Sequence, residues 1–254
     1  MIADERPTIR TKSSSDIAAV QAVQQAGVAA MLAVWEYLQS ATEPTAEAAH
    51  DVIDMVLAEH DCESPAGHIV AAGPASAEPH EIGSGVISRG VPIVVDIYPR
   101  SKETGFWGDL TRTVCLGTPP AELQKMYDTV LRAQEQAIAM VGPGVRCADI
   151  HHAVETVFAE AGFETSGQGT EFPFAEGFVH STGHGVGQNV HEAPKVSGKS
   201  EDVLQPGNVI TIEPGLYYKR IGGVRLEDLL VVTETGYRSL TTLPKKLRLL
   251  DQKV

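Results

Sequence analysis

Hydrophobic residues along this chain follow two periods in turn, and the alternation predicts pairs of helices followed by pairs of strands. After a serine triplet, apolar residues at helical spacing predict a helix from about Ser14 to Ser40. A second helix is predicted to open at Thr42 and Pro44 and to end near His60. The apolar runs VPIVVDIYP and DLTRTVCLG then predict two strands, joined by the polar connection RSKETGFWG.

The second part of the chain repeats this order. Two further helices are predicted over about 119–140 and 147–161, with strands around Val179, from Val209 to Glu213 and from Val224 to Val232. No linker rich in Pro, Gly or Ser divides the chain. The pattern therefore predicts an α+β fold in which two similar αα-ββ halves share a central, mostly antiparallel sheet.

Composition narrows the classes of function. The 254 residues are 43% hydrophobic and carry a formal net charge of −13, so the chain is globular but lacks the excess of Lys and Arg that nucleic acid binding requires. We find no signal peptide and no uninterrupted apolar run of about 18 residues, and therefore expect no membrane partner and a cytoplasmic location. Cys62, Cys115 and Cys147 are widely spaced and predict buried, reduced thiols.

Four carboxylates lie where the pattern predicts apolar strands. Asp96 ends one run and Asp109 begins the returning strand, and Glu213 and Glu227 take the corresponding places in the second half. Residues opposed across antiparallel strands share a face at about 5 Å, and four inward acids would repel each other unless a cation lay between them. His184, in the glycine-rich GHGVG, is the candidate imidazole. An oxygen-rich set with one imidazole suits Mn, Co, Zn or Fe.

Each of these features also has a plainer interpretation. A single acid in a strand is more often exposed to solvent or held in an ordinary ion pair, and only the combination of four acids with GHGVG favours a metal site. GHGVG is also compatible with a phosphate-binding loop, but no Lys-Ser/Thr follows it and its match to GxGxxG is weak.

Five motifs in a fixed order resemble the pita-bread metallopeptidases, the group of methionine aminopeptidase, Xaa-Pro aminopeptidase, Xaa-Pro dipeptidase (prolidase) and the metal-free creatinase. The motifs are DIYPRSKETGFWGDLTRT, STGHGVG, NVHEAP, TIEPGLY and GGVRLEDLL, and the resemblance extends over residues 9–247. It implies the pita-bread fold. We expect residues 13–250 to be a single catalytic domain, preceded by an N-terminal extension, residues 1–12, in place of a separate creatinase-type N-terminal domain.

The resemblance also implies roles for individual residues. The implied ligands of a two-metal centre are Asp96, Asp109, His184, Glu213 and Glu227. Asp109 and Glu227 would bridge two divalent ions, with manganese expected before Co, Zn or Fe. Glu213 would also be the general base and proton shuttle. His191 would donate to the scissile carbonyl, and His80 would contact the substrate near the leaving nitrogen.

His180 and Arg225 distinguish the branches of the family. Both resemble positions of the Xaa-Pro enzymes that help to form the site for proline-containing peptides, and a salt bridge to Asp228 or Glu227 is the plainer alternative for Arg225. The resemblance implies an exopeptidase that cleaves the Xaa-Pro bond at a free N-terminus, aminopeptidase-like first and a dipeptidase next. Methionine aminopeptidase, a creatinase-like enzyme and a non-catalytic peptide-binding protein are the remaining alternatives.

Two departures from the family pattern bear on the substrate. Twelve residues separate Asp96 from Asp109 where most relatives have ten, and Tyr98 stands in place of a glycine. The extra residues fall in the connection, so the strands can still oppose the two acids. Phe106 and Trp107 of this connection either shape the rim of the substrate cleft or pack the hairpin. The short N-terminal extension leaves peptide length and oligomeric state open, a homodimer included.

Overall fold

The computed structural model describes residues 11–165 and 176–249, so most of the predicted extension, residues 1–10, lies outside the described residues. The α-helices are α1 (Ser14–Ser40), α2 (Ala46–Glu59), α3 (Ala121–Met140) and α4 (Cys147–Glu160), close to the predicted ranges. Ser13 begins α1 with a capping box, because its hydroxyl accepts from Asp16 N–H while its own N–H donates to the Asp16 carboxylate. α2 is capped by Thr45 rather than Thr42.

The strands form two main sheets. The first has the order β13-β5-β3-β2 and the second the order β12-β11-β8-β6-β7. Their strands are β2 (Ile69–Ala72), β3 (Ile93–Ile97), β5 (Leu110–Leu116), β6 (Gly183–Gly185), β7 (Glu192–Val196), β8 (Val209–Ile212), β11 (Asp228–Val232), β12 (Tyr237–Ser239) and β13 (Arg248–Leu249). The pairing within them is antiparallel except between β13 and β5.

Shorter elements complete the fold. β1 (Cys62–Glu63) pairs with β4 (Arg100–Ser101), and the 3-10 helix η1 (Gly73–Ala77) follows β2. β9 (Gly215–Tyr218) and β10 (Gly222–Arg225) form an antiparallel hairpin.

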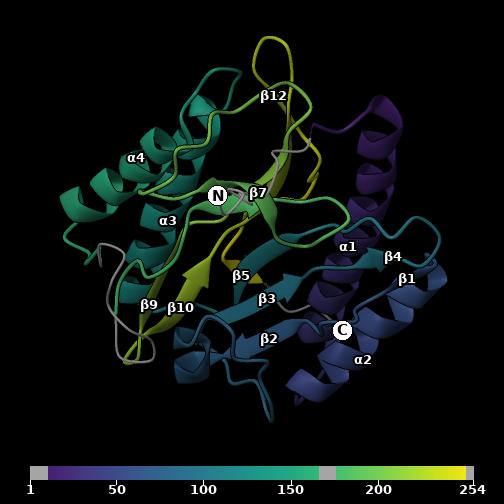
Figure 1. The fold of residues 1–254 in the computed structure, drawn as a ribbon. Coiled ribbons are helices and arrows are strands. Elements are labelled where there is room, and N and C mark those ends of the chain that lie inside the picture. The colour runs from purple at the N-terminus through teal and green to yellow at the C-terminus, as the bar shows by residue number, and fades with distance from the viewer. Residues whose placement is uncertain (1–10, 166–175, 250–254) are drawn as a thin grey trace, which may run out of the picture.

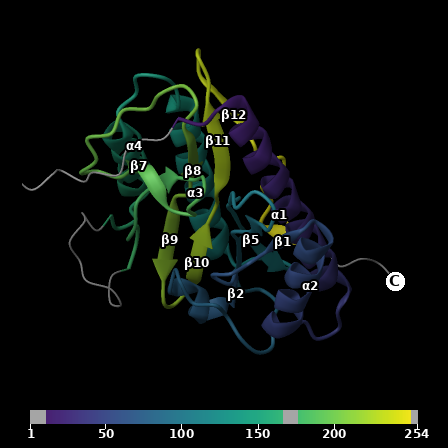
Figure 2. The same ribbon diagram turned by 45° about the vertical axis from the view of Figure 1, so that its right-hand side comes forward.

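Each half of the molecule has its own core. α1 and α2 pack against the first sheet through buried residues such as Val34 and Val95, and α3 and α4 pack against the second through residues such as Val130 and Ile210. Figures 1 and 2 show the two helix pairs on opposite sides of the sheets. The three cysteines are buried and unpaired, as the sequence predicts. This arrangement is the predicted pair of similar halves.

Helix α1 is the most apolar of the long helices. Among the described residues it alone is long and apolar enough to cross a membrane by length and composition, and half of its apolar stretch is buried inside the protein. Val20, Met31 and Leu38 on this helix are fully buried core residues. Packing in the core therefore accounts for its hydropathy.

The two sheets meet where β5 passes the segment between β10 and β11. Glu227 N–H donates to Thr111 O at 3.0 Å. The Thr113 hydroxyl donates to Arg225 O and accepts from Arg225 N–H, both at 2.9 Å. Hydrogen bonding thus divides the predicted central sheet into two sheets, and this seam joins them.

The second half departs from the predicted strands in two places. The run from Val224 to Val232 is interrupted at Leu226 and Glu227, and the β9–β10 hairpin is inserted between β8 and β11. The predicted strand around Val179 is wrong, since its neighbours make only isolated bridges and β6 begins later, at Gly183.

Candidate active site

In the first half, strand pairing places two acids on one face. Asp96 of β3 pairs with Thr111 of β5, so Asp109 lies two residues further along on the same side, offset diagonally. The fully buried Gln24 of α1 holds the backbone of Asp109 from behind. Its Oε1 accepts from Asp109 N–H at 2.8 Å and its Nε2 donates to Asp109 O at 2.9 Å. A core helix therefore fixes the position of this acid.

In the second half the acids lie at the end of one strand pair. Asp228 of β11 pairs with Ile212 of β8, and Glu227 and Glu213 are the next residues beyond this pair. The buried Gln134 of α3 donates through Nε2 to Ile212 O at 3.1 Å, one residue before Glu213. The two halves thus use one glutamine each, from their long helix, to hold an acid-bearing strand.

The glycines around His184 are required by close strand packing. A Cβ at Gly183 would lie 2.0 Å from Thr211 O, and one at Gly185 would lie 2.4 Å from Ala193 O. The pairing register between β6 and β7 shifts between His184 and Gly185, which is the irregularity of a β-bulge. Only glycine permits this approach, and it brings the imidazole among the carboxylates.

The donor set fits a divalent cation. One ligand atom from each of Asp109, His184 and Glu227 lies within 4.8 Å of the others. His184 donates from Nδ1 to a backbone carbonyl at 3.1 Å, so Nε2 is the ring atom that faces Glu213 at 3.2 Å and Asp109 at 3.7 Å. Asp96 Oδ1 is buried without a hydrogen-bond partner. Carboxylate oxygens and an imidazole nitrogen gathered in this way suit a divalent cation, which would take the place of a proton on Nε2.

The electrostatics of the acids support the same conclusion. Burial, with the charges of neighbouring carboxylates added, raises the pKa of Asp109 and of Glu227 well above the ordinary value. Burial also raises the pKa of Asp96, although the charge of Arg225 opposes this shift. Acids that crowd one another without a cation retain their protons, and a divalent ion would favour their charged form.

Glu213 behaves differently from the other acids. Burial alone would raise its pKa, but the hydrogen bond and charge of His184, together with His180 and Arg225, lower the pKa to about 2. In His184 burial lowers the pKa, and the hydrogen bond and charge of Glu213 more than offset this and raise it. Glu213 is therefore a carboxylate at neutral pH and is able to accept a proton.

Arg225 connects the second half to the first. Its Nη2 donates to Asp96 Oδ2 at 2.9 Å and its Nη1 to the Tyr217 hydroxyl at 2.8 Å, while Nε donates to Thr111 Oγ1 at 3.2 Å. The Thr111 hydroxyl in turn donates to Glu227 Oε2 at 2.8 Å. Arg225 thus pairs with a predicted metal ligand rather than with Asp228 or Glu227.

His180 is part of the same hydrogen-bond chain. Its Nδ1 lies 2.7 Å from Ser181 O, which can only accept, so Nδ1 carries the proton and Nε2 accepts from the Tyr217 hydroxyl at 2.8 Å. Burial lowers the pKa of His180 to about 4, and burial raises that of Tyr217 to about 12. At neutral pH a neutral histidine, a protonated phenol and Arg225 therefore form one chain.

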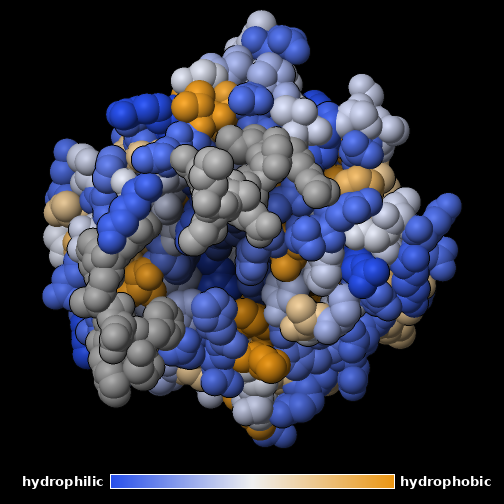
Figure 3. All heavy atoms as spheres, in the orientation of Figure 1, coloured by the Kyte–Doolittle hydropathy of each residue, from blue (hydrophilic) through white to orange (hydrophobic). Residues whose placement is uncertain are grey.

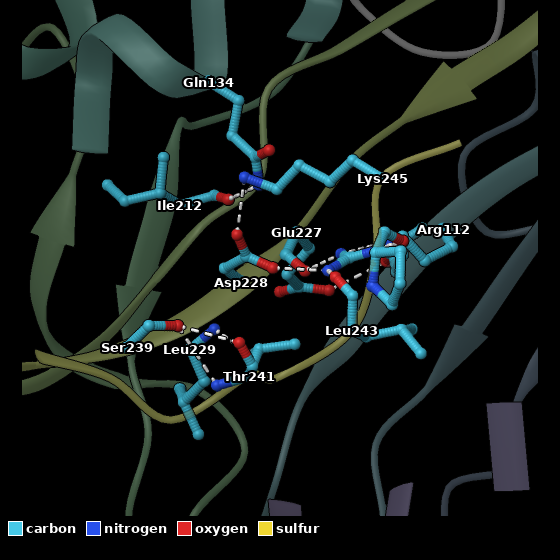
Figure 4. A network of polar contacts seen from close by, with 12 residues as sticks. Arg112, Gln134, Ile212, Glu227, Asp228, Leu229, Ser239, Thr241, Leu243 and Lys245 are labelled. Atoms are coloured by element: carbon cyan, nitrogen blue, oxygen red, sulfur yellow. Dashed lines mark hydrogen bonds and ion pairs between the residues drawn. The ribbon is translucent and has the colours of Figure 1, made fainter. Parts of the chain in front are cut away.

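Behind the acids, a buried arginine holds the backbone of the second half. Arg112 donates through Nη1 to Glu227 O at 2.6 Å and through Nη2 to Asp228 Oδ1 at 2.7 Å and Leu243 O at 2.9 Å (Figure 4). Lys245 Nζ lies 2.7 Å from the other Asp228 oxygen. Arg112 and Lys245 thus neutralise Asp228, and Arg225 pairs with Asp96 instead.

All nine residues that the sequence singled out line one cavity of about 1170 Å³. On the face drawn in Figure 3 the centre is hollowed, with hydrophilic side chains in the hollow. His80 and His191 are exposed residues of the cavity wall, and Tyr98 lines it as well. Lys195 and Lys199 add cationic side chains to the wall. The cavity combines a cluster of acids with separate groups able to contact a bound molecule.

The aromatic residues of the β3–β5 connection have different positions. Trp107 is 9% exposed and packs in a cluster with Val20 and Val186, and Phe106 packs against that cluster. These two side chains pack the hairpin, as the plainer interpretation held, whereas Tyr98 faces the cavity.

Sequence reasoning missed several residues of the site. Tyr217, Thr111 and Gln24 contact the predicted residues without being ligands themselves. Gln24 is a buried polar residue in a helix of apolar period, and Tyr217 lies inside the quoted TIEPGLY motif. Their position was visible in the sequence, but their partners depend on contacts between distant segments.

A family model matches most of the chain. The model of metallopeptidase family M24 matches residues 18–234, which include the whole acid and histidine cluster. The chain belongs to metallopeptidase family M24. Like the M24 proteins that it resembles in structure, it has the pita-bread fold.

Similar M24 proteins are peptidases. The chain is 35% identical over 239 residues to an Xaa-Pro dipeptidase of Pyrococcus horikoshii, an alignment that covers 93% of this chain and 64% of that protein. The prolidase from Pyrococcus furiosus has a TM-score of 0.83 at 30% identity, covering 92% of this chain and 66% of that one. The X-Pro aminopeptidase from Thermotoga maritima has a TM-score of 0.82 at 28% identity, covering 95% and 65%. This M24 chain thus spans slightly less than two thirds of the relatives it matches.

Proposed function

We propose that the chain is a metal-dependent exopeptidase that hydrolyses the Xaa-Pro bond at the free N-terminus of peptides, with dipeptides as the preferred substrates. The observation that carries the proposal is the hydrogen-bond chain from Asp96 through Arg225 and Tyr217 to His180, which connects a candidate metal ligand to the wall of the cavity. Xaa-Pro peptidases among the relatives support the same reaction. The amide before proline has no N–H to donate, so a site for it must recognise other groups.

The candidate ligands fit two divalent ions. Asp96, Asp109, His184, Glu213 and Glu227 supply carboxylate oxygens and one imidazole around one point of the cavity, a set suited to manganese first and to Co, Zn or Fe as alternatives. When bound, such ions supply Lewis acidity and lower the pKa of water. Asp109 and Glu227 would be shared ligands of this set, and bound cations would favour their charged forms.

The remaining steps, proton transfer and substrate binding, fall to side chains of the protein. Glu213 is charged at neutral pH and accepts a proton from the attacking water before passing it to the departing nitrogen. Burial, reinforced by the charge of His184, lowers the pKa of His191, and this exposed imidazole donates a hydrogen bond to the scissile carbonyl oxygen. His80 contacts the substrate near the leaving nitrogen. His180 and Arg225 shape the part of the site that receives proline.

A cationic side chain in the cavity supports a short substrate. Lys195 lines the same cavity as the acid cluster, together with Glu201 and Asp202, and the C-terminal carboxylate of a dipeptide would be attracted to its ammonium group. In a tripeptide that carboxylate lies one residue further away. The relatives favour the dipeptidase as well, so the aminopeptidase, which the sequence placed first, becomes the second candidate.

Hydrolysis of three peptides tests the proposal. Ala-Pro, Ala-Pro-Ala and Met-Ala-Ser are compared side by side with added Mn²⁺ or Co²⁺, with Asp109→Ala as the blank. We expect the parent protein alone to cleave Ala-Pro, and to cleave Ala-Pro-Ala more slowly. Cleavage of Met-Ala-Ser only would identify a methionine aminopeptidase, and a metal-loaded protein that cleaves none of them would be the peptide-binding alternative.

The wider organisation is proposed on the same basis. We take residues 13–250 as one catalytic unit in the cytoplasm, acting on peptides with a free N-terminus. Light scattering decides between a monomer and a homodimer, which the sequence left open.

A further inference from the structure

An ion pair outside the acid cluster connects the start of the described chain to the cavity wall. Lys12, just before α1, pairs through Nζ with Glu192 Oε1 of β7, and their side chains are only 4% and 10% exposed. The two residues are 180 positions apart in the sequence. Lys12 is also fixed by its backbone, because its N–H donates to Gly207 O at 2.8 Å. The cation is therefore held in place from two directions.

Glu192 adjoins both ends of one loop. We call residues 186–191, between β6 and β7, the His191 loop. Glu192 follows its last residue directly, and a Cβ at Gly187 would lie 2.6 Å from Glu192 Oε2, so the carboxylate packs on the backbone of Gly187 near the start of the loop. Gly187 O also accepts from Trp107 N–H at 2.9 Å. The loop is thus held between Glu192 and the β3–β5 connection.

The loop carries side chains into the cavity. Asn189, Val190 and His191 all line it. The ring of His191 lies 4.3 Å from that of His184, centroid to centroid, in an edge-to-face arrangement of 87°. A displacement of the loop would therefore move His191 relative to the candidate metal ligands.

The energetics of buried ion pairs favour a role for this pair in positioning rather than in stability. A buried pair is weak evidence for stability, because the cost of removing two charges from water offsets their attraction, whereas removing one partner leaves the other charge unpaired. An unpaired Glu192 carboxylate would turn toward water and release Gly187.

We infer that Lys12 is a positioning residue, which holds the His191 loop against the cavity through Glu192 and thereby sets the place of His191. Its effect on catalysis rests on the proposed function, but its effect on the loop does not. The amide of Trp107 donates to the loop, whereas the next amide, Gly108 N–H, donates to Pro99 O at 2.9 Å, outside it. Hydrogen exchange at the Trp107 amide therefore reports on the loop, and exchange at the Gly108 amide is the internal control.

Hydrogen exchange measures the loop directly. Lys12→Met is expected to speed exchange of the Trp107 amide about tenfold while Gly108 is unchanged. The double variant Lys12→Met/Glu192→Gln replaces the ion pair by neutral groups of similar size and should return Trp107 exchange toward the parent rate. Arg220→Met, which removes an exposed cation paired with Glu122, is the matched control and should change neither amide.

Kinetics give the second readout. On Ala-Pro, Lys12→Met should lower kcat about tenfold with little change in KM, and the double variant should recover most of that loss. A Lys12→Met protein that melts earlier but keeps parental Trp107 exchange and parental kcat per folded molecule would overturn the inference, since the pair would then be purely structural. Where Lys12→Met does not fold, Glu192→Gln and the double variant carry the same comparison. If the parent cleaves no Xaa-Pro peptide, the exchange data still decide the role of Lys12.

Discussion

The two halves of the molecule supply acids in similar ways but differ in what else they bring. In the first half one acid lies in β3 and the other directly before β5, its paired strand, and only twelve residues separate the two acids in sequence. In the second half the β9–β10 hairpin is inserted between β8 and β11, and it carries Tyr217 and Arg225. Arg225 reaches across to Asp96 of the first half. Under the proposed function, both halves would supply metal ligands, and the inserted hairpin would add the groups that distinguish substrates.

The strongest test of this comparison removes one central acid from each half. Asp109→Asn and Glu227→Gln keep the shape of the side chains but remove a charge from the ligand set. Both should lower kcat/KM on Ala-Pro by about 10³-fold or more and reduce the bound metal, because both acids belong to the cluster that would hold the metal under the proposed function. Metal content and steady-state kinetics measure this, and a loss below tenfold in either variant would contradict equal participation of the halves.

A second test concerns β6, whose sequence is Gly-His-Gly and which belongs to the second half alone. Gly183→Ala places a Cβ 2.0 Å from a backbone oxygen and should lower the free energy of unfolding by about 3 kcal/mol. Gly236→Ala is the matched control, since nothing lies within 4 Å of its added Cβ. Urea denaturation of both variants checks the difference. Equal stability would show that β6 tolerates a wider spacing than the structure has.

The third test uses the pKa of His180. Its folded value of about 4 lies below the ordinary 6.5, so the unfolded chain binds this proton more readily, and stability falls as the pH is lowered from about 6.5 toward 4. With allowance for partial exposure, the parent should lose about 1.5 kcal/mol more than His180→Gln between pH 7 and pH 5. Urea titrations of both proteins with chelator present measure this. A variant that follows the parent at both pH values would mean that His180 is already protonated or exposed.

The smallest effect is expected from the inserted hairpin alone. Tyr217→Phe removes the hydroxyl between Arg225 and His180 and should lower kcat/KM on Ala-Pro about fivefold, the scale of a hydrogen bond. The amount of bound metal should equal that of the parent protein, which would show that Tyr217 acts on the substrate and not on metal binding. Loss of metal in this variant would instead show that Tyr217 helps to hold the metal ligands in place.

The chemistry of the site could be predicted further from the sequence than its geometry. Acids at the ends of β-branched runs predicted the cluster, and these positions depend on local periodicity. The offset between Asp96 and Asp109, the pairing of Arg225 with Asp96 and the contact of Gln24 with Asp109 depend on strand register and on helix packing across long separations. Such contacts leave no signal in the local sequence. The wrong strand around Val179 has the same cause, because its local composition favours a strand but no neighbouring strand pairs with it along its length.

The pairing of β13 with β5 has a consequence for the order of synthesis. β5, next to Asp109, emerges from the ribosome well before Arg248 and Leu249, which complete its edge, and before Leu243 and Lys245, which hold Arg112 and Asp228. Contacts of such long sequence separation form late, because a long loop must close first. The first half is therefore translated early but matures late, and a nascent chain cannot acquire the finished site before its last described residues are free to fold.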